Sequence, residues 1–253
     1  MTDTELVHLV VAAGIATVTL DSSHNRNALS RQLVTELTDR LSSASALPDV
    51  RAIVLTHTGT TFCAGADLSE AATGPMAGTA AGLLGLLRLI VELPRPVIAR
   101  IHGNVRAGGI GLLGACDIVV AAPSSTFGIT EARLGLAAAV ISVTVLPRID
   151  DRSAARYFLT GSAFDAAEAQ RIGLVTVVAD DVESAVAAFA ADLLKASPQG
   201  LVESKRLANR SVRAAIERHG DEMVELSARL FASEEAHEGM TAFLERRPPR
   251  WTV

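Results

Sequence analysis

The chain contains few of the residues from which disulfide frameworks and metal sites are built. Only two of its 253 residues are cysteines, and Cys63 and Cys116 lie in apolar surroundings without Cys-x-x-Cys spacing. We therefore expect two reduced, buried thiols and no disulfide. The histidines show no spacing typical of metal ligands, so the sequence predicts no metal site.

Basic clusters and long apolar runs are also scarce. The net charge is −5, and Arg246-Arg247 is the one basic cluster, which argues against a nucleic-acid partner. The longest uncharged apolar run, residues 134–146, is too short to cross a bilayer. Residues 1–5 have neither the cationic flank nor the apolar segment of a signal peptide. We therefore expect a cytoplasmic protein without a membrane partner.

Aromatic residues make up only 4% of the chain against 49% hydrophobic residues overall, which suits a core packed by alanine, valine and leucine. In the first half, strand-like and helix-like patterns alternate, which favours an α/β fold. The expected strands are residues 6–11, 15–20, 52–56, 96–101 and 118–121, and the expected helices are residues 29–41 and 82–93. Residues 71–81, rich in glycine, alanine and threonine, are the expected mobile loop.

From residue 151 onward the patterns are mainly helical. The expected helices are residues 154–159, 166–172, 182–196, 201–209 and 214–231, with Gly173 closing the second of them. No linker composition separates the two halves. We therefore predict one fold unit with a core over residues 1–190 and a helical C-terminal extension over residues 191–253.

Two glycine-rich turns carry the main functional signal. The run Thr61 to Leu68 follows the strand expected at residues 52–56, and the run Gly103 to Gly111 leads into an apolar segment. Small residues in tight turns leave backbone N–H groups free to point at a ligand. Two such turns can each donate one N–H group to a single oxygen, which is how a thioester enolate is stabilised.

The order of these motifs resembles the crotonase (enoyl-CoA hydratase/isomerase) family over nearly the whole chain. Further segments that carry the resemblance are residues 25–29, 116–118, 159–161, 166–175 and 242–247, the last being similar to the family's C-terminal helix. The resemblance implies a crotonase-like spiral of ββα repeats with a helical C-terminal extension that mediates trimers, often paired into hexamers. It also implies an acyl-CoA substrate and no separate cofactor, because coenzyme A is part of the substrate.

The resemblance assigns the catalytic positions. The N–H groups of Ala66 and Gly108 correspond to the oxyanion-hole donors, with Gly108 expected at a helix N-terminus. Hydratases of the family carry two glutamates. One is present as Glu131 in Phe127-Gly128-Ile129-Thr130-Glu131, whereas Gly111 occupies the position of the other. Glu131 is thus the expected general acid/base, if its apolar neighbours raise its pKa.

The vacated position leaves three functions open. A single glutamate at this position is similar to the family's Δ3,Δ2-enoyl-CoA isomerases, whereas residues 130–142 resemble hydratases that act on branched, glutaconyl-type esters. Hydration of a 2-enoyl-CoA is the preferred hypothesis, isomerisation is the first alternative and a non-catalytic acyl-CoA binder is the second. Loss of the glutamate at position 111 is expected to leave room for a branched or carboxylated acyl chain.

The remaining assignments concern the coenzyme A moiety and its surroundings. By motif position, the resemblance places the thioester's coenzyme A on Arg26, Ala28, Ala64, Asp67, Leu68, Phe243 and Arg246. Phe243 and Arg246 are expected to cover the nucleotide of a neighbouring subunit, and Asp67 is expected to brace its own loop. Arg106 is expected to be a solvated or interface residue, with contact to an acidic substrate as the alternative. Asp117 is expected to be a buried hydrogen-bonding residue.

Overall fold

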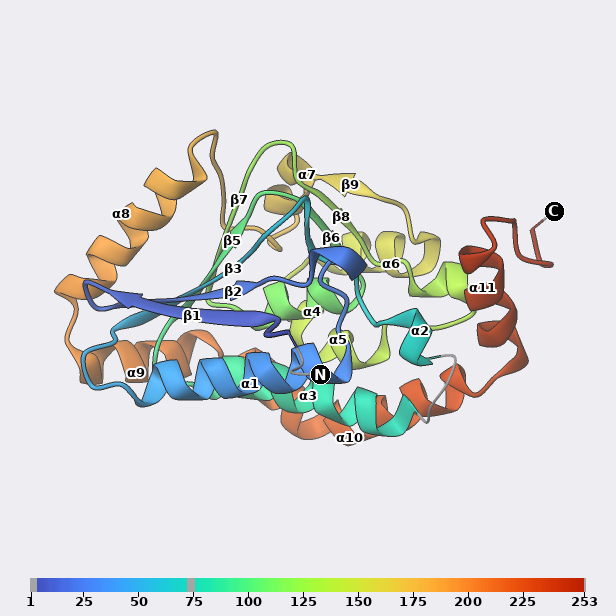
Figure 1. Cartoon of the computed structure of the whole chain (residues 1–253), viewed down its shortest axis with the longest axis horizontal. Coiled ribbons are helices and arrows are strands. Elements are labelled where there is room, and N and C mark those ends of the chain that lie inside the picture. The colour runs from blue at the N-terminus through green and yellow to red at the C-terminus, as the bar shows by residue number, and fades with distance from the viewer. Residues whose placement is uncertain (1–3, 72–75, 253) are drawn as a thin grey trace.

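The structure, a computed structural model, describes residues 4–71 and 76–252 and contains two β-sheets wrapped by helices (Figure 1). The larger sheet has the order β1-β2-β3-β5-β7-β10 and the smaller sheet the order β4-β6-β8-β9. The strands of the larger sheet are β1 (Val7–Ala12), β2 (Ile15–Leu20), β3 (Ala52–His57), β5 (Val97–Ile101), β7 (Ile118–Ala121) and β10 (Val177–Val178). Those of the smaller sheet are β4 (Thr61–Cys63), β6 (Asn104–Arg106), β8 (Thr126–Gly128) and β9 (Phe164–Asp165).

Helices lie between the strands and also form the last part of the chain. They are α1 (Arg31–Ala46), α2 (Leu68–Ala71), α3 (Met76–Glu92), α4 (Gly108–Ala115), α5 (Ala139–Val145), α6 (Asp151–Thr160), α7 (Ala166–Arg171), α8 (Val182–Lys195), α9 (Pro198–Ala208), α10 (Arg210–Phe231) and α11 (Glu234–Leu244). Two short 3₁₀ helices, η1 (Ser23–Asn25) and η2 (Glu131–Leu134), complete the list.

The chain repeats one unit three times. In each repeat a strand of the larger sheet is followed by a strand of the smaller sheet and then by helical structure, as in β3-β4-α3, β5-β6-α4 and β7-β8-α5. Strands β3, β5 and β7 pair in parallel, and so do β4, β6 and β8. The expected spiral of ββα repeats is therefore confirmed.

The parallel strand β3 in the larger sheet is buried on both faces, as expected for an interior parallel strand. Successive side chains of a strand point to opposite faces. In β3, Ile53 and Leu55 belong to the main core, whereas Val54 packs with Val182 and Val186 of α8. Helices α1, α3 and α10 run next to one another along the other face (Figure 1).

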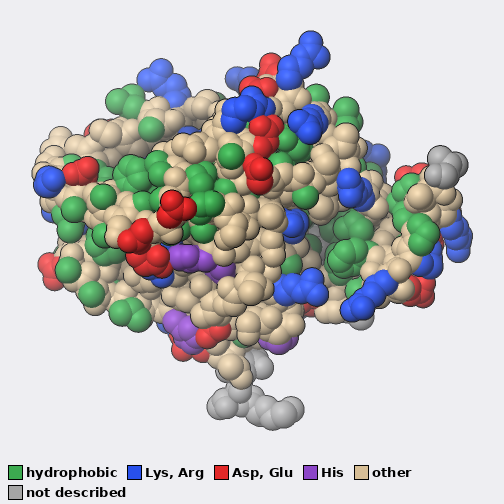
Figure 2. Space-filling view, turned by 90° about the horizontal axis from the view of Figure 1, so that it is seen from above, with side chains coloured by type: hydrophobic (Ala, Val, Ile, Leu, Met, Phe, Trp, Pro, Cys, Tyr) green, Lys and Arg blue, Asp and Glu red, His purple; other side chains and the backbone are tan. Residues whose placement is uncertain are grey.

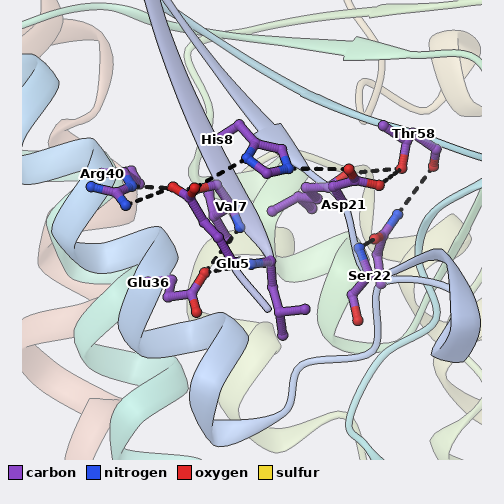
Figure 3. Close-up of polar contacts among 11 residues, drawn as sticks. Glu5, Val7, His8, Asp21, Ser22, Glu36, Arg40 and Thr58 are labelled. Atoms are coloured by element: carbon purple, nitrogen blue, oxygen red, sulfur yellow. Dashed lines mark hydrogen bonds and ion pairs between the residues drawn. The ribbon is translucent and has the colours of Figure 1, made fainter. Parts of the chain in front are cut away.

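A polar network fixes the N-terminal hairpin to its neighbours (Figure 3). Glu36 of α1 accepts hydrogen bonds from the N–H groups of Leu6 and Val7, at 2.7 and 3.0 Å. Nε2 of His8 lies 3.1 Å from Asp21, whose other carboxylate oxygen accepts a 2.5 Å hydrogen bond from Thr58. These contacts connect α1, β1 and the end of β3, directly before the first glycine-rich turn.

A buried ion pair ties the C-terminal helices to the sheet. Lys205 of α9 donates to the carbonyl oxygens of Ile90 and Arg95 and forms a 2.9 Å ion pair with Asp117. Asp117 also accepts a 2.7 Å hydrogen bond from Asn209. The prediction that Asp117 is a hydrogen-bonding residue is confirmed, although 14% of its side chain is exposed. Helices α9 and α10 are thus anchored in the core.

Two predictions about local structure were wrong. Residues 76–81 of the expected mobile loop form the first turns of α3, because their alanines favour a helix that continues into the apolar segment behind them. Residues 72–75 of that loop lie outside the described residues. The C-terminal helix ends at Leu244, not at Arg247, because the Arg247 guanidinium folds back onto the Glu238 carboxylate with contacts of 2.7 and 3.0 Å.

Candidate active site

The two glycine-rich turns meet in space. Gly65 adopts a φ of 94°, which a residue with a side chain rarely adopts, and a Cβ atom there would lie 2.7 Å from the Cβ atom of Ala107 and 3.5 Å from the nitrogen of Gly108. Gly108 is the first residue of α4, as predicted. Within the described residues, neither the Ala66 N–H nor the Gly108 N–H has a protein acceptor. Both N–H groups are therefore free to donate to a ligand, and their role as oxyanion donors stays a prediction.

The backbone at Ala107 holds the second turn in place. Ala107 has a φ of 46° and a ψ of −118°, a conformation that L-residues seldom adopt, and its N–H donates a 2.9 Å hydrogen bond to the carbonyl oxygen of Gly128. Such a conformation typically costs about 1–3 kcal/mol and is found mainly at functional sites. The hydrogen bond also links the start of α4 to β8, the strand that precedes Glu131.

Glu131 begins η2, three residues after β8. The residue as a whole is half-buried, but its Oε2 atom is fully buried and has no hydrogen-bond partner among the described residues. Burial raises the pKa of the Glu131 carboxyl to about 7, although the N–H groups of Glu131 and Thr130 act in the opposite direction. A carboxyl group with this pKa can accept and return a proton near neutral pH.

Three of the residues predicted to hold coenzyme A, namely Arg26, Ala28 and Ala64, lie on two adjacent turns. Arg26 adopts a left-handed conformation, and its carbonyl oxygen accepts a 3.1 Å hydrogen bond from the N–H of Ala64. Leu29, directly after Ala28, donates a 2.7 Å hydrogen bond to the carbonyl oxygen of Gly65. The turn around Arg26 and Ala28 therefore runs alongside the oxyanion turn.

Asn27 supports both of these turns and has no role in the sequence-based prediction. Its side chain is fully buried, accepts from the N–H of Ser22 at 2.7 Å and donates to the carbonyl oxygens of Thr58 and Thr61 at 3.3 and 2.8 Å. It also has a positive φ of 54°, which asparagine tolerates better than most residues. An asparagine between two short turns is the one signal of this role in the sequence.

Asp67 braces its own loop, as predicted. One carboxylate oxygen accepts hydrogen bonds from the N–H and the hydroxyl of Ser69, at 3.0 and 2.5 Å, and the other accepts from Asn25 at 3.0 Å. Burial alone would raise the pKa of Asp67, but the hydrogen bonds from Ser69 and Asn25 outweigh it and lower the pKa. Asp67 thus fixes the chain between the oxyanion turn and Leu68, where α2 begins.

The C-terminal helix lies against η2 of the same chain. A Cβ atom on Gly239 of α11 would lie 2.5 Å from the carbonyl carbon of Leu134, and one on Gly135 would lie 2.6 Å from the carbonyl carbon of Glu235. Glycine at these positions permits backbone-to-backbone contact. Phe243 is 58% exposed, and Arg246 follows the end of α11 with a φ of 55°. Their role at a nucleotide stays a prediction.

Comparison with known proteins agrees with this geometry. Residues 11–253 match the family model described as enoyl-CoA hydratase/isomerase. The chain belongs to the enoyl-CoA hydratase/isomerase family of enzymes. A crystal structure of an enoyl-CoA hydratase from Mycobacterium avium is 50% identical, with a TM-score of 0.92, and the match covers 98% of this chain and 100% of that one.

Two of the relatives have names that include a specific acyl group. The mevalonyl-coenzyme A hydratase of Aspergillus fumigatus is 33% identical over 94% of this chain and 91% of its own length. The cyclohexa-1,5-dienecarbonyl-CoA hydratase of Thauera aromatica is 32% identical over 81% of this chain and 80% of its own length. Both names describe hydratases of acyl-CoA thioesters, like the family model.

This member of the enoyl-CoA hydratase/isomerase family has no free space at the vacated position. A Cβ atom on Gly111 would lie 2.6 Å from Cγ2 and 2.9 Å from Cβ of Ile141, which is 2% exposed. The expectation that loss of the glutamate leaves room for a branched acyl chain is therefore wrong at this point of the site. The side chain of Ile141 in α5 fills the space.

Arg106 is hydrogen-bonded within the fold and is not simply solvated, whereas its expected roles at an interface or at an acidic substrate stay predictions. It is half-buried, and its guanidinium donates to the carbonyl oxygens of Val105 and Thr126, at 2.9 and 2.7 Å, and to the Thr126 hydroxyl at 2.8 Å. These bonds brace β6 against β8. The sequence could not indicate this because the partners lie about twenty residues away on another strand.

Figure 2 shows how side chains of different types are distributed on one face of the molecule. On the face drawn in Figure 2, lysine and arginine side chains are interspersed with aspartate and glutamate, and hydrophobic side chains gather near the C-terminal end. None of the described helices is long and apolar enough to span a bilayer.

Proposed function

We propose that this chain hydrates the double bond of a 2-enoyl-CoA thioester, with Glu131 as the single acid/base and the Ala66 and Gly108 N–H groups as oxyanion donors. The observation that carries the proposal is the Glu131 carboxyl, buried at Oε2 and with its pKa raised to about 7, on a segment hydrogen-bonded to the turn that bears Gly108. The hydratase names among the relatives support the same reaction class.

The proposed reaction uses one carboxylate twice. Glu131 takes a proton from water while the water oxygen bonds to C3, and the electron pair of the double bond moves onto the thioester oxygen. The enolate formed in this way is stabilised by the N–H groups of Ala66 and Gly108, each typically worth about 3–4 kcal/mol. Glu131 then returns its proton to C2, which gives a 3-hydroxyacyl-CoA and restores the carboxylate.

Isomerisation of a 3-enoyl-CoA to a 2-enoyl-CoA is the second candidate. The observation that favours it is Gly111, because a site with one carboxylate can move a proton from C2 to C4 without holding a water molecule. The test is a turnover screen with straight-chain, branched and carboxylated enoyl-CoA esters in which hydration and isomerisation are scored separately. Turnover that persists in Glu131→Gln would remove Glu131 from the mechanism of either reaction, and acyl-CoA binding without any turnover would indicate a non-catalytic binder.

A preference for carboxylated, glutaconyl-type esters remains part of the proposal on grounds of charge. Glycine at position 111 removes a negative charge that would repel a substrate carboxylate. The mevalonyl-CoA hydratase among the relatives supports acyl groups that are not straight hydrocarbon chains. A kcat/KM for crotonyl-CoA equal to or above that of every carboxylated ester would refute this preference.

We further propose a homotrimer, or a hexamer of two trimers, in which Phe243 and Arg246 approach the coenzyme A bound to a neighbouring subunit. Exposed apolar side chains at the end of α11, with Phe243 58% and Leu244 57% exposed, support an interface there. Light scattering after size-exclusion chromatography gives the mass. Arg246→Ala is expected to weaken binding of free coenzyme A, and an unchanged affinity would remove Arg246 from the site.

A further inference from the structure

Helices α4 and α5 touch at two glycines of α4. Gly111 faces Ile141, and a Cβ atom on Gly114 would lie 2.7 Å from the carbonyl oxygen of Thr144. The Thr144 hydroxyl also donates a 3.0 Å hydrogen bond to the carbonyl oxygen of Gly111. Because backbone atoms meet at one contact and a buried hydrogen bond spans the other, the two helices cannot separate to admit a larger residue at position 111.

Ile141 cannot turn away from Gly111 either. Both its Cγ2 and its Cβ atoms lie within 3.0 Å of the place where a Cβ atom at position 111 would stand, at 2.6 and 2.9 Å. Rotation about χ1 moves Cγ2 but leaves Cβ in place, and a β-branched residue in a helix has one strongly preferred rotamer. Only the Cα atom of Ile141, at 3.5 Å, lies at an ordinary contact distance.

We propose that Ile141 is a specificity-determining residue of the active site: its side chain occupies the space that an acidic side chain at position 111 would need, and so restricts the acid–base chemistry to Glu131. This inference rests on the proposed function, because it assigns to Ile141 the choice between one and two carboxylates in that reaction. Gly111 and Ile141 form a matched pair, because the side chain of Ile141 fills the space that glycine leaves empty at position 111.

An acidic residue at position 111 is expected to function only in combination with a smaller residue at position 141. Gly111→Glu alone is expected to yield an unstable protein without a gain in hydration. Gly111→Glu combined with Ile141→Gly restores the carboxylate after the whole Ile141 side chain, including its Cβ atom, has been removed. General-base assistance is typically worth about 10²–10⁴-fold, so the ratio of hydration of crotonyl-CoA to isomerisation of a straight-chain 3-enoyl-CoA is expected to rise by at least about tenfold over the wild type.

The variant series includes controls for folding. Gly111→Ala adds one methyl group and is expected to lower Tm by about 4–10 °C, with the loss smaller when it is introduced into Ile141→Gly. Ile141→Ala is expected to relieve it less, because the Cβ atom at 2.9 Å remains. If the glutamate double variant does not fold, Gly111→Asp with Ile141→Gly provides the shorter acid for the same kinetic comparison.

A second glycine contact, away from the candidate site, serves as a control that changes packing without changing the catalytic groups. A Cβ atom on Gly220 of α10 would lie 3.0 and 3.3 Å from the two terminal methyl groups of Leu84 in α3, in a helix contact without an assigned catalytic residue. Gly220→Ala and Leu84→Ala are expected to compensate each other in Tm while the ratio of the two reactions stays unchanged.

The outcomes distinguish this inference from the proposed function. If the wild type is active through Glu131 and the folded acidic double variants show an unchanged ratio, the inference about Ile141 is wrong and the proposed function stands. If the wild type turns over none of the esters, the proposed function fails. In that case the Tm values of the single and double variants decide whether the side chain of Ile141 fills the space beside Gly111. If Gly111→Ala lowers Tm equally with isoleucine and with glycine at position 141, the inference about Ile141 is refuted.

Discussion

The raised pKa of Glu131 predicts a specific pH profile. With a pKa of about 7, about one-eleventh of the carboxyl is ionised at pH 6 and about ten-elevenths at pH 8. Both proposed reactions begin with the carboxylate form, so kcat/KM is expected to fall about tenfold from pH 8 to pH 6. An unperturbed glutamate with a pKa of about 4.3 would remain almost fully ionised over this interval and would give a flat profile.

The assay is the initial rate at low substrate concentration, since kcat/KM reports the ionisation of the free enzyme. Glu131→Gln is expected to lower kcat by about 10²–10⁴-fold while acyl-CoA affinity changes little. A flat profile between pH 6 and pH 8 would refute the burial argument, and a loss of kcat smaller than about threefold would remove Glu131 from the mechanism.

The raised pKa of Glu131 also makes the stability of the fold depend on pH. Because the folded-state pKa lies above that of an unfolded glutamate, the folded chain binds more protons between about pH 4.3 and pH 7. The stability contributed by the protonated form is complete below that interval and is lost as the pH rises through about 7. Glu131→Gln is neutral at every pH and is therefore expected to raise Tm more at pH 8 than at pH 5. A larger gain at pH 5 would contradict the sign of the shift.

Three further predictions concern residues that support the site. Lys205→Met is expected to destabilise the fold by about 3–5 kcal/mol in urea unfolding, because it removes the buried cation 2.9 Å from the Asp117 carboxylate, and adding Asp117→Asn should recover part of the loss. Asn27→Ala removes three hydrogen bonds, two of them buried, and is expected to cost at least about 1–3 kcal/mol and to raise KM; full stability would contradict this. Gly239→Ala is expected to displace η2 and lower kcat more than acyl-CoA affinity, whereas Gly85→Ala, which meets nothing within 4 Å, should leave activity unchanged.

The parts of the fold that could be predicted are those with long, regular patterns. The strand at residues 118–121 was predicted at its observed bounds, and the strand at residues 52–56 and the helix at residues 182–196 each differ from the structure by one residue at one end. The strands of the smaller sheet and β10 are two or three residues long, too short for an alternating pattern to be recognised. Their existence depends on pairing between distant segments, such as Phe127 with Phe164.

In the candidate site, too, local motifs could be predicted from the sequence, whereas contacts between distant residues could not. The two glycine-rich turns and Glu131 were identified from the sequence because each motif lies within about ten consecutive residues. The positive φ of Ala107 was not predicted, because alanine is not a residue that signals this conformation. The space beside Gly111 could not be judged from the sequence either, since Ile141 lies thirty residues further along the chain and on another helix.

The position of Glu131 depends on a helix more than a hundred residues away. The resemblance implies a C-terminal helix that mediates trimers, and α11 is in addition in backbone contact with η2 of its own chain through Gly135 and Gly239. These glycines leave no gap between the catalytic turn and α11, so a movement of α11 must move Glu131 or break the contact. A subunit that docks on the exposed face of α11 would therefore act, through η2, on the proposed general base Glu131. For this reason oligomeric state and pH profile are best measured on the same preparation.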